Sequence, residues 1–238
     1  MAADRLDEVL DAAYTCLTRY GVRRTTVDDI AGVMGVSRSA VYQYVRGKDD
    51  AFRRLAERLH RQALARARRA AAAPGAPHAE RIRGVLAAKL DLALTLAGDS
   101  PHTAELLDGG ARLFAPACAD FGTALRELLT ELFAGLFAEA DRAAGVDGAA
   151  GADRAAEAGR CTRVGPAEAA DIAIALVRGL EPTPNARDLL GPAADALTTG
   201  LLHTRADVAA GVAAGADQAT AGGPNSRTAS ATMASRLA

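Results

Sequence analysis

The sequence is poor in the residues that build β-sheets. Aromatic residues make up only 4% of the 238 positions and tryptophan is absent, whereas alanine occurs 59 times. Strands are enriched in aromatic and β-branched residues, and alanine has the highest helix propensity of all residues. This composition excludes most all-β folds, and we expect an all-α protein.

Cysteine and histidine are also scarce. The three cysteines, Cys16, Cys118 and Cys161, form no CxxC pair, and the four histidines form no HExxH motif. The spacing excludes a disulfide framework and the common zinc motifs, and it is typical of a protein from a reducing cytoplasm. We expect no metal ion and no cofactor.

Signatures of membrane proteins and of common enzymes are missing as well. A membrane-spanning helix needs about 20 consecutive apolar residues, and the best candidate, residues 84–98, is interrupted by Lys89 and Asp91. The first eleven residues carry five charged side chains, which excludes a secretory leader there. Neither a GxSxG nucleophile motif nor a GxxxxGK[ST] phosphate-binding loop occurs. We therefore expect a protein that is neither embedded in a membrane nor an enzyme.

The net charge of −1 conceals an uneven distribution of charge. Residues 1–72 contain 14 basic and 9 acidic residues, whereas the rest of the chain contains 14 basic and 20 acidic residues. A basic amino-terminal unit joined to an acidic body is typical of a chain that brings one end to the phosphates of a nucleic acid.

Apolar residues at helical spacing predict a series of helices. A first helix carries an apolar face from Leu6 to Leu17 and ends at Gly21. Two short helices capped by Thr26 and Ser37 follow, and a long fourth helix opens at the acidic pair 49–50 and runs to Pro74. Further helices are predicted over residues 78–98, 101–113, 116–144, 166–180 and 187–204. We expect residues 145–164 to form a loop and residues 206–238 to form a disordered tail.

The two short helices, joined by a tight turn at residues 34–36, have the dimensions of a helix-turn-helix. In that motif the second helix enters the major groove with its first residues against the base edges. Arg38 can pair with guanine and Gln43 with adenine, while hydroxyl groups and a lysine beside a helix start can bind phosphates. The candidate DNA-binding residues are therefore Thr25, Thr26, Ser37, Arg38, Ser39, Tyr42, Gln43, Tyr44 and Lys48.

This stretch resembles the DNA-binding domain of the TetR family of transcriptional regulators. The resemblance covers about residues 4–62. The sequence departs from the family pattern at Val45, where an aromatic residue is frequent, and at Tyr44, where histidine is common; the departures affect packing and one phosphate contact. The matching residues are Tyr20-Gly21, Thr25-Thr26, Ile30-Ala31, Gly35-Val36-Ser37, Tyr42-x-Tyr44 and Lys48-Asp49-Asp50-Ala51-Phe52.

The resemblance implies about nine helices in two domains. The first is a three-helix DNA-binding domain over residues 4–62, with its helix-turn-helix at about 26–45. The second, over residues 78–205, binds an effector and dimerises. We expect a cytoplasmic homodimer, formed through residues 166–204, that binds a near-palindromic double-stranded operator.

We further expect a small, largely apolar effector to enter the body, shift the fourth helix and release the DNA, as in a repressor. The candidate ligand-binding residues lie on or between the predicted helices of the body: His102, Leu106, Phe114, Cys118, Phe121, Leu125, Phe133, Phe137 and Arg178.

Simpler explanations exist for several of these residues. The phenylalanines can be core residues, Cys16 and Cys118 can be small buried apolar residues, and His102 can mark an exposed helix start. Tyr44 can lie partly in the core, and the arginines of the fourth helix can form a solvated face. Two other classes also fit the sequence: a dimer of the same fold that senses no small molecule, controlled by a protein partner or acting as an activator, and an enzyme or binding protein with an inactive head.

Overall fold

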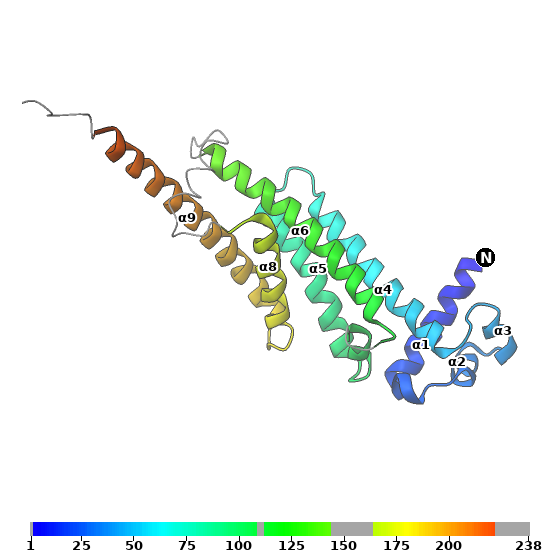
Figure 1. Cartoon of the computed structure of the whole chain (residues 1–238). Helices are drawn as coiled ribbons and strands as arrows, with labels where there is room; N and C mark the ends of the chain where they lie inside the picture. Colours follow the sequence, from blue (N-terminus) through cyan, green and yellow to red (C-terminus); the bar gives the residue numbers. More distant parts are fainter. Residues whose placement is uncertain (1, 109–111, 144–163, 222–238) are drawn as a thin grey trace, which may run out of the picture.

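The computed structural model describes residues 2–108, 112–143 and 164–221. Within these ranges the chain forms eight α-helices, one short 3-10 helix and no strand, which confirms the all-α class. A small helical head lies at one end of an elongated body, and the last helix projects from the opposite end (Figure 1).

The head consists of three helices and the start of a fourth. They are α1 (Ala2–Arg24), α2 (Val27–Met34), α3 (Arg38–Tyr42) and α4 (Lys48–Ala71). Fully buried apolar side chains from all four meet in its core, among them Leu17, Ile30, Val41 and Phe52. Gly21 was predicted to end α1, and its φ of 75° and ψ of 169° do break the helical backbone there, although one more helical stretch follows to Arg24.

Helix α4 belongs to the head and the body at once. Ala51, Phe52 and Leu55 are buried near its start, while Ala63 and Ala67 are buried two turns and more further along. Along its length α4 contacts α1 in the head and α5 and α6 in the body. One helix therefore joins the two halves of the molecule.

The body is built around α5 (His78–Asp99), which contacts α4, α6, α8 and α9. These partners are α6 (Ala115–Ala143), α8 (Pro166–Leu180) and α9 (Ala186–Ala221). Fully buried leucines and Phe133 fill the space between the helices. Among the described residues, no helix is long and apolar enough to cross a membrane.

Two predicted elements differ from the structure. The helix predicted over 101–113 is instead the short 3-10 helix η1 (Thr103–Leu107), because the Thr103 hydroxyl bonds back to the carbonyl oxygens of Ser100 and Leu96 and holds a tight turn there. Helix α9 continues to Ala221, so residues 206–221 of the predicted disordered tail are helical. The predicted loop up to residue 163 and the tail from residue 222 lie outside the described residues.

Candidate DNA interface and ligand cavity

Local capping sets the geometry of the helix-turn-helix. The Thr26 hydroxyl accepts a hydrogen bond from the Asp29 amide at 3.2 Å, and the Asp29 carboxylate accepts one from the Thr26 amide at 2.8 Å. Gly35 ends α2 with a φ of 67°, a left-handed conformation that favours glycine. Ser37 caps α3 by accepting the Ala40 amide at 3.3 Å. The predicted caps at Thr26 and Ser37 are confirmed.

The exposed face of α3 presents a preorganised arginine. Arg38 donates to the Asp28 carboxylate at 3.0 Å and to the Tyr42 hydroxyl at 3.0 Å, and its guanidinium carbon lies 5.4 Å from the centre of the Tyr42 ring. The hydrogen bond to Tyr42 and the charge of Asp28 raise the pKa of Arg38 above its ordinary value. Ser39 and Gln43 are exposed beside them. This face can offer a charged donor and several polar groups to DNA.

Three predicted DNA-binding residues are engaged within the protein. Thr25 is fully buried and donates its hydroxyl to the Gly21 carbonyl at 2.8 Å. Tyr44 is half-buried against the core. The Lys48 ammonium donates to the carbonyl oxygens of Val22 and Arg23 at 3.2 and 3.0 Å. Thr25 and Lys48 thus hold the end of α1 in place beside the start of α4.

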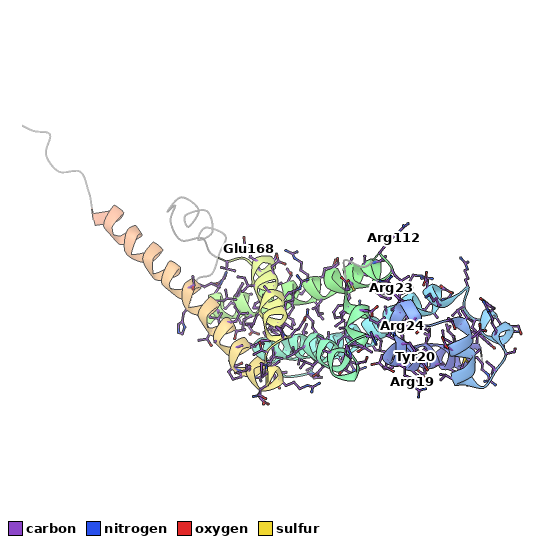
Figure 2. The ribbon with its side chains drawn as sticks, turned by 90° about the horizontal axis from the view of Figure 1, so that it is seen from below. Arg19, Tyr20, Arg23, Arg24, Arg112 and Glu168 are labelled. Carbon is purple, nitrogen blue, oxygen red and sulfur yellow. The ribbon has the colours of Figure 1, made fainter. Side chains whose placement is uncertain are left out.

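The end of α1 carries exposed basic residues that the sequence reasoning did not single out. Arg19, Tyr20, Arg23 and Arg24 lie there together (Figure 2), and all four are exposed. None of the three arginines forms an ion pair with another described residue. Their position directly before the predicted phosphate contacts at residues 25–26 is the signal that could have identified them.

The body contains a cavity of about 760 Å³ between α4, α5, α6 and α8. Four of the nine predicted ligand-binding residues line it: Cys118, Phe121, Leu125 and Arg178. Four others are instead buried in the core, at most 3% exposed: Leu106, Phe114, Phe133 and Phe137. His102 lies against Gly21 at the junction of head and body, 3.6 Å from Glu105.

Two ion pairs that were not predicted form part of the cavity wall. The Arg126 guanidinium on α6 donates to the Asp171 carboxylate on α8 at 2.6 Å. Lys89 on α5 pairs with Glu181, which directly follows α8. The Arg126 hydrogen bond lowers the pKa of Asp171 below its ordinary value, so this carboxylate stays charged. Each pair joins elements that are distant in sequence, and no local pattern indicates it.

Comparison with known proteins identifies the head. Residues 9–55 match the family model described as bacterial regulatory proteins, tetR family. Residues 9–55 are therefore a DNA-binding domain of the TetR family. A DNA-binding transcriptional regulator is the function that the match supports. No curated protein matches the chain in sequence.

Solved structures match the chain over most of its length. A protein from Pseudomonas aeruginosa PAO1 described as a transcriptional regulator is 17% identical, with a TM-score of 0.65, and the match covers 87% of this chain and 94% of that one. A TetR/AcrR regulator from Thermobifida fusca YX-ER1 is 19% identical, with a TM-score of 0.59 and coverage of 83% and 98%. FadR from Bacillus subtilis, solved with stearoyl-CoA, is 15% identical, with a TM-score of 0.53 and coverage of 82% and 96%. These likenesses establish a shared fold.

His60 is the residue through which α4 reaches the cavity. Its Nδ1 atom lies 2.8 Å from the Ala56 carbonyl oxygen and its Nε2 atom lies 3.7 Å from the Cys118 sulfur. Its ring meets Phe121 edge to face at 5.3 Å. Burial lowers the pKa of His60 below its ordinary value, against a smaller opposing effect of the Ala56 carbonyl. The imidazole is therefore neutral at pH 7, with its proton on Nδ1.

The same helix is bound to the head two residues earlier. The Arg58 guanidinium on α4 contacts the carboxylates of Asp11 and Asp7 on α1 at 2.6 and 3.3 Å, and its side chain is only 15% exposed. Arg58 had been placed on a solvated basic face, and the structure shows a bridge between helices instead. The ion pairs of Arg58 therefore join α4 to α1.

The outer face of α8 and α9 exposes apolar side chains. Ile172 and Leu189 are each 42% exposed and are among the most exposed large apolar residues of the described chain. Several other members of the predicted dimer seam are instead buried within the same chain: Ala170, Ala173, Val177, Leu190 and Leu201. The part of the seam that remains available to a second subunit is therefore narrower than the sequence pattern suggested.

Proposed function

We propose that this TetR-family protein is a homodimeric repressor that leaves its operator when a small, largely apolar effector enters the cavity. One observation carries the proposal: α4 lines the cavity through His60 and is fixed to the DNA-binding head through Lys48 and Arg58. A single helix thus touches both sites that a ligand-responsive regulator must couple.

On the DNA side, the exposed face of α3 reads the operator. Arg38 is placed to pair with a guanine, which requires it to exchange its Asp28 partner for the base. Gln43 reads a neighbouring base pair, and Thr26, Ser37, Ser39 and Tyr42 contact phosphates. Arg19, Arg23 and Arg24 extend the positive surface along the end of α1. Such a regulator acts on chromosomal DNA in the cytoplasm.

On the ligand side, the effector displaces α4 by contact with His60 and Phe121. A coupling free energy of about 1–3 kcal/mol between the two sites changes the operator affinity by about 5- to 150-fold. The solved structures of FadR with stearoyl-CoA and of SmeT with triclosan show small molecules bound to proteins of this fold, which supports a ligand site here.

The dimer places two heads on one operator. Exposed Ile172 and Leu189 on α8 and α9 pack against the same residues of a second subunit. The dimer geometry at this seam sets the separation of the two recognition helices. Because the two subunits are related by a two-fold axis, the operator is near-palindromic.

The experiment begins with selection of bound sequences from random DNA. On the selected operator, Arg38→Ala lowers the specific affinity by about 1–3 kcal/mol and leaves the affinity for random DNA nearly unchanged. Arg142→Ala, which alters an exposed arginine at the far end of α6, is the matched control and leaves both affinities unchanged. If the Arg38 variant bound the operator as tightly as the original protein, Arg38 would not belong to the DNA interface.

The effector arm uses compounds that raise the melting temperature of the protein. Each such compound is added to the protein–operator complex, and the fraction of bound DNA is measured. We expect the compound to weaken operator binding by about 5- to 150-fold and so to release the DNA. A compound that binds in the cavity and leaves operator affinity unchanged would favour a regulator that senses no small molecule.

A further inference from the structure

We propose that the effector carries an oxyanion head group, a carboxylate in the first place, which binds Arg178 while its apolar part fills the rest of the cavity. This inference rests on the proposed function, because it names the chemistry of the molecule that enters the same cavity. The residues that carry it lie on α8 and on the elements that face it.

The charged groups of the cavity are almost completely paired. The stripe of α8 that lines it includes Asp171, Ile174 and Arg178, and Glu181 follows on the same stripe. Asp171 is bonded to Arg126 at 2.6 Å, and Glu181 is bonded to Lys89. Both carboxylates of the stripe already have a cation from another helix.

Arg178 is the exception in this lining. It forms no hydrogen bond and no ion pair with any described residue, and it is exposed at the cavity. Three cations and two carboxylates therefore line the wall, and the uncompensated charge is that of Arg178. An arginine that faces a ligand site with all its donors free is suited to bind a carboxylate with two parallel hydrogen bonds.

The alternatives fit this wall less well. A cationic ligand would meet Arg178 and find no free carboxylate, since Asp171 and Glu181 are already engaged. A neutral acceptor such as a hydroxyl group would gain a hydrogen bond from Arg178, but without the ion pair and the second parallel hydrogen bond that a carboxylate gains.

The position of Arg178 leaves an apolar surface for the rest of the molecule. Along the axis of α8, Arg178 lies about 10 Å from Asp171 and about 4.5 Å from Glu181. Helices α5 and α6 contribute apolar residues to the lining, Leu92, Phe121 and Leu125 among them. His60 and Cys118, which also line the cavity, are uncharged, because burial lowers the pKa of His60 and raises the pKa of Cys118. The cavity volume of about 760 Å³ is in the range of small-molecule sites.

The test compares probes that share one alkyl chain and differ in the head group. Octanoate, octyl phosphate, octanol and octylamine are titrated into the full-length protein, and binding is measured by calorimetry. Octanoate is expected to bind about tenfold more tightly than octanol, and octylamine more weakly than either. Octyl phosphate binding more tightly than octanoate would assign the same site to a phosphate head group. Equal binding of octanoate and octanol, or preference for octylamine, overturns the proposal.

Variants connect the preference to Arg178. Arg178→Gln is expected to weaken octanoate binding about tenfold and to leave octanol binding unchanged, while Arg178→Lys restores part of the difference. Arg112→Gln, at an exposed arginine outside the cavity lining (Figure 2), is the matched control and changes neither. An undiminished preference for octanoate in Arg178→Gln overturns the assignment.

Binding and DNA release are measured separately, so the two proposals can fail separately. If octanoate binds through Arg178 and the operator complex is unaffected, the anion site stands and the ligand-responsive repressor is wrong. If other compounds release the DNA equally from the original protein and from Arg178→Gln, the repressor stands and the anion site is wrong.

Discussion

His60 connects α4 to the cavity, and its burial gives the protein a predictable response to acid. In the unfolded chain the imidazole titrates near its ordinary pKa of 6.5, and in the folded protein it titrates at lower pH. The unfolded state therefore binds the proton first as the pH falls. The free energy of unfolding is expected to decrease as the pH drops below about 6.5, until the lower folded pKa is reached.

Urea unfolding between about pH 7.5 and pH 5 measures this decrease. The variant His60→Gln should show a smaller decrease, while His203→Gln, which alters an exposed histidine, should behave as the original protein. An unchanged pH profile in His60→Gln would contradict the assignment.

Asp50 contributes to the free energy of unfolding in a lower pH range. Burial alone would raise the pKa of Asp50, but the Arg46 amide and the guanidinium groups of Arg54 and Arg53 lower it overall. The stabilising effect of the Asp50 carboxylate is therefore lost only below about pH 4.

At the level of single residues, the sequence predicts what depends on near neighbours. Thr26 and Ser37 were identified as caps because a cap and its partner lie three residues apart. The partners of Lys48 lie 25 and 26 residues away, and its role in holding α1 could not be deduced from spacing. That Arg178 has no partner among the described residues is evident only because the structure shows which carboxylates are already paired.

Among the elements, α4 and α1 form the link on which the proposed response depends. Arg58→Gln removes both ion pairs to Asp7 and Asp11, which are largely exposed, so we expect a loss of about 1 kcal/mol in the free energy of unfolding. Operator affinity without effector should change little, whereas the decrease caused by an effector should become smaller. Urea unfolding and operator titrations with and without effector measure the two effects.

Arg61→Gln is the control for this prediction, since Arg61 is exposed on the same helix and forms no ion pair with a described residue. It should preserve both stability and response. An Arg58 variant that responds fully to effector would show that α4 transmits the signal by another contact.

Helix bounds were predicted well where apolar spacing and caps agree. The helix predicted over 166–180 corresponds to α8, which begins with Pro166 and ends at Leu180. The helix predicted over 101–113 was wrong. At η1 the Thr103 hydroxyl donates a hydrogen bond to the Ser100 carbonyl oxygen, and such side-chain bonds to the backbone compete with a regular helix. It was also wrong over residues 206–221, where small residues suggested a flexible tail although alanine strongly favours helix.

For the whole molecule, the proposed dimer depends on the apolar residues that the single chain leaves exposed. Ile172→Asp and Leu189→Asp, made together, should raise the dissociation constant of the dimer by at least about tenfold, because charges would be buried without partners. Operator binding should weaken in parallel. Analytical ultracentrifugation measures the first effect, and titration on the selected operator measures the second.

Ala65→Asp on the exposed face of α4 is the control and should leave the dimer intact. Dimers that persist in the double variant would place the interface elsewhere. The sequence pattern assigned to the predicted seam several residues that are buried within the single chain, because helical spacing cannot distinguish a side chain buried within one chain from a side chain buried between two.

The continuity of α4 also matters to anyone who builds hybrid regulators from this protein. A junction between residues 62 and 78, the boundary suggested by the sequence, would keep Arg58 with Asp7 and Asp11 but would separate His60 from Phe121 and Cys118. A transplanted head would then recognise its operator without responding to the ligand of its new body. A functional hybrid must therefore carry the cavity-facing residues of α4 with the body and its α1-facing residues with the head, which means that the two parents must be interleaved within this one helix.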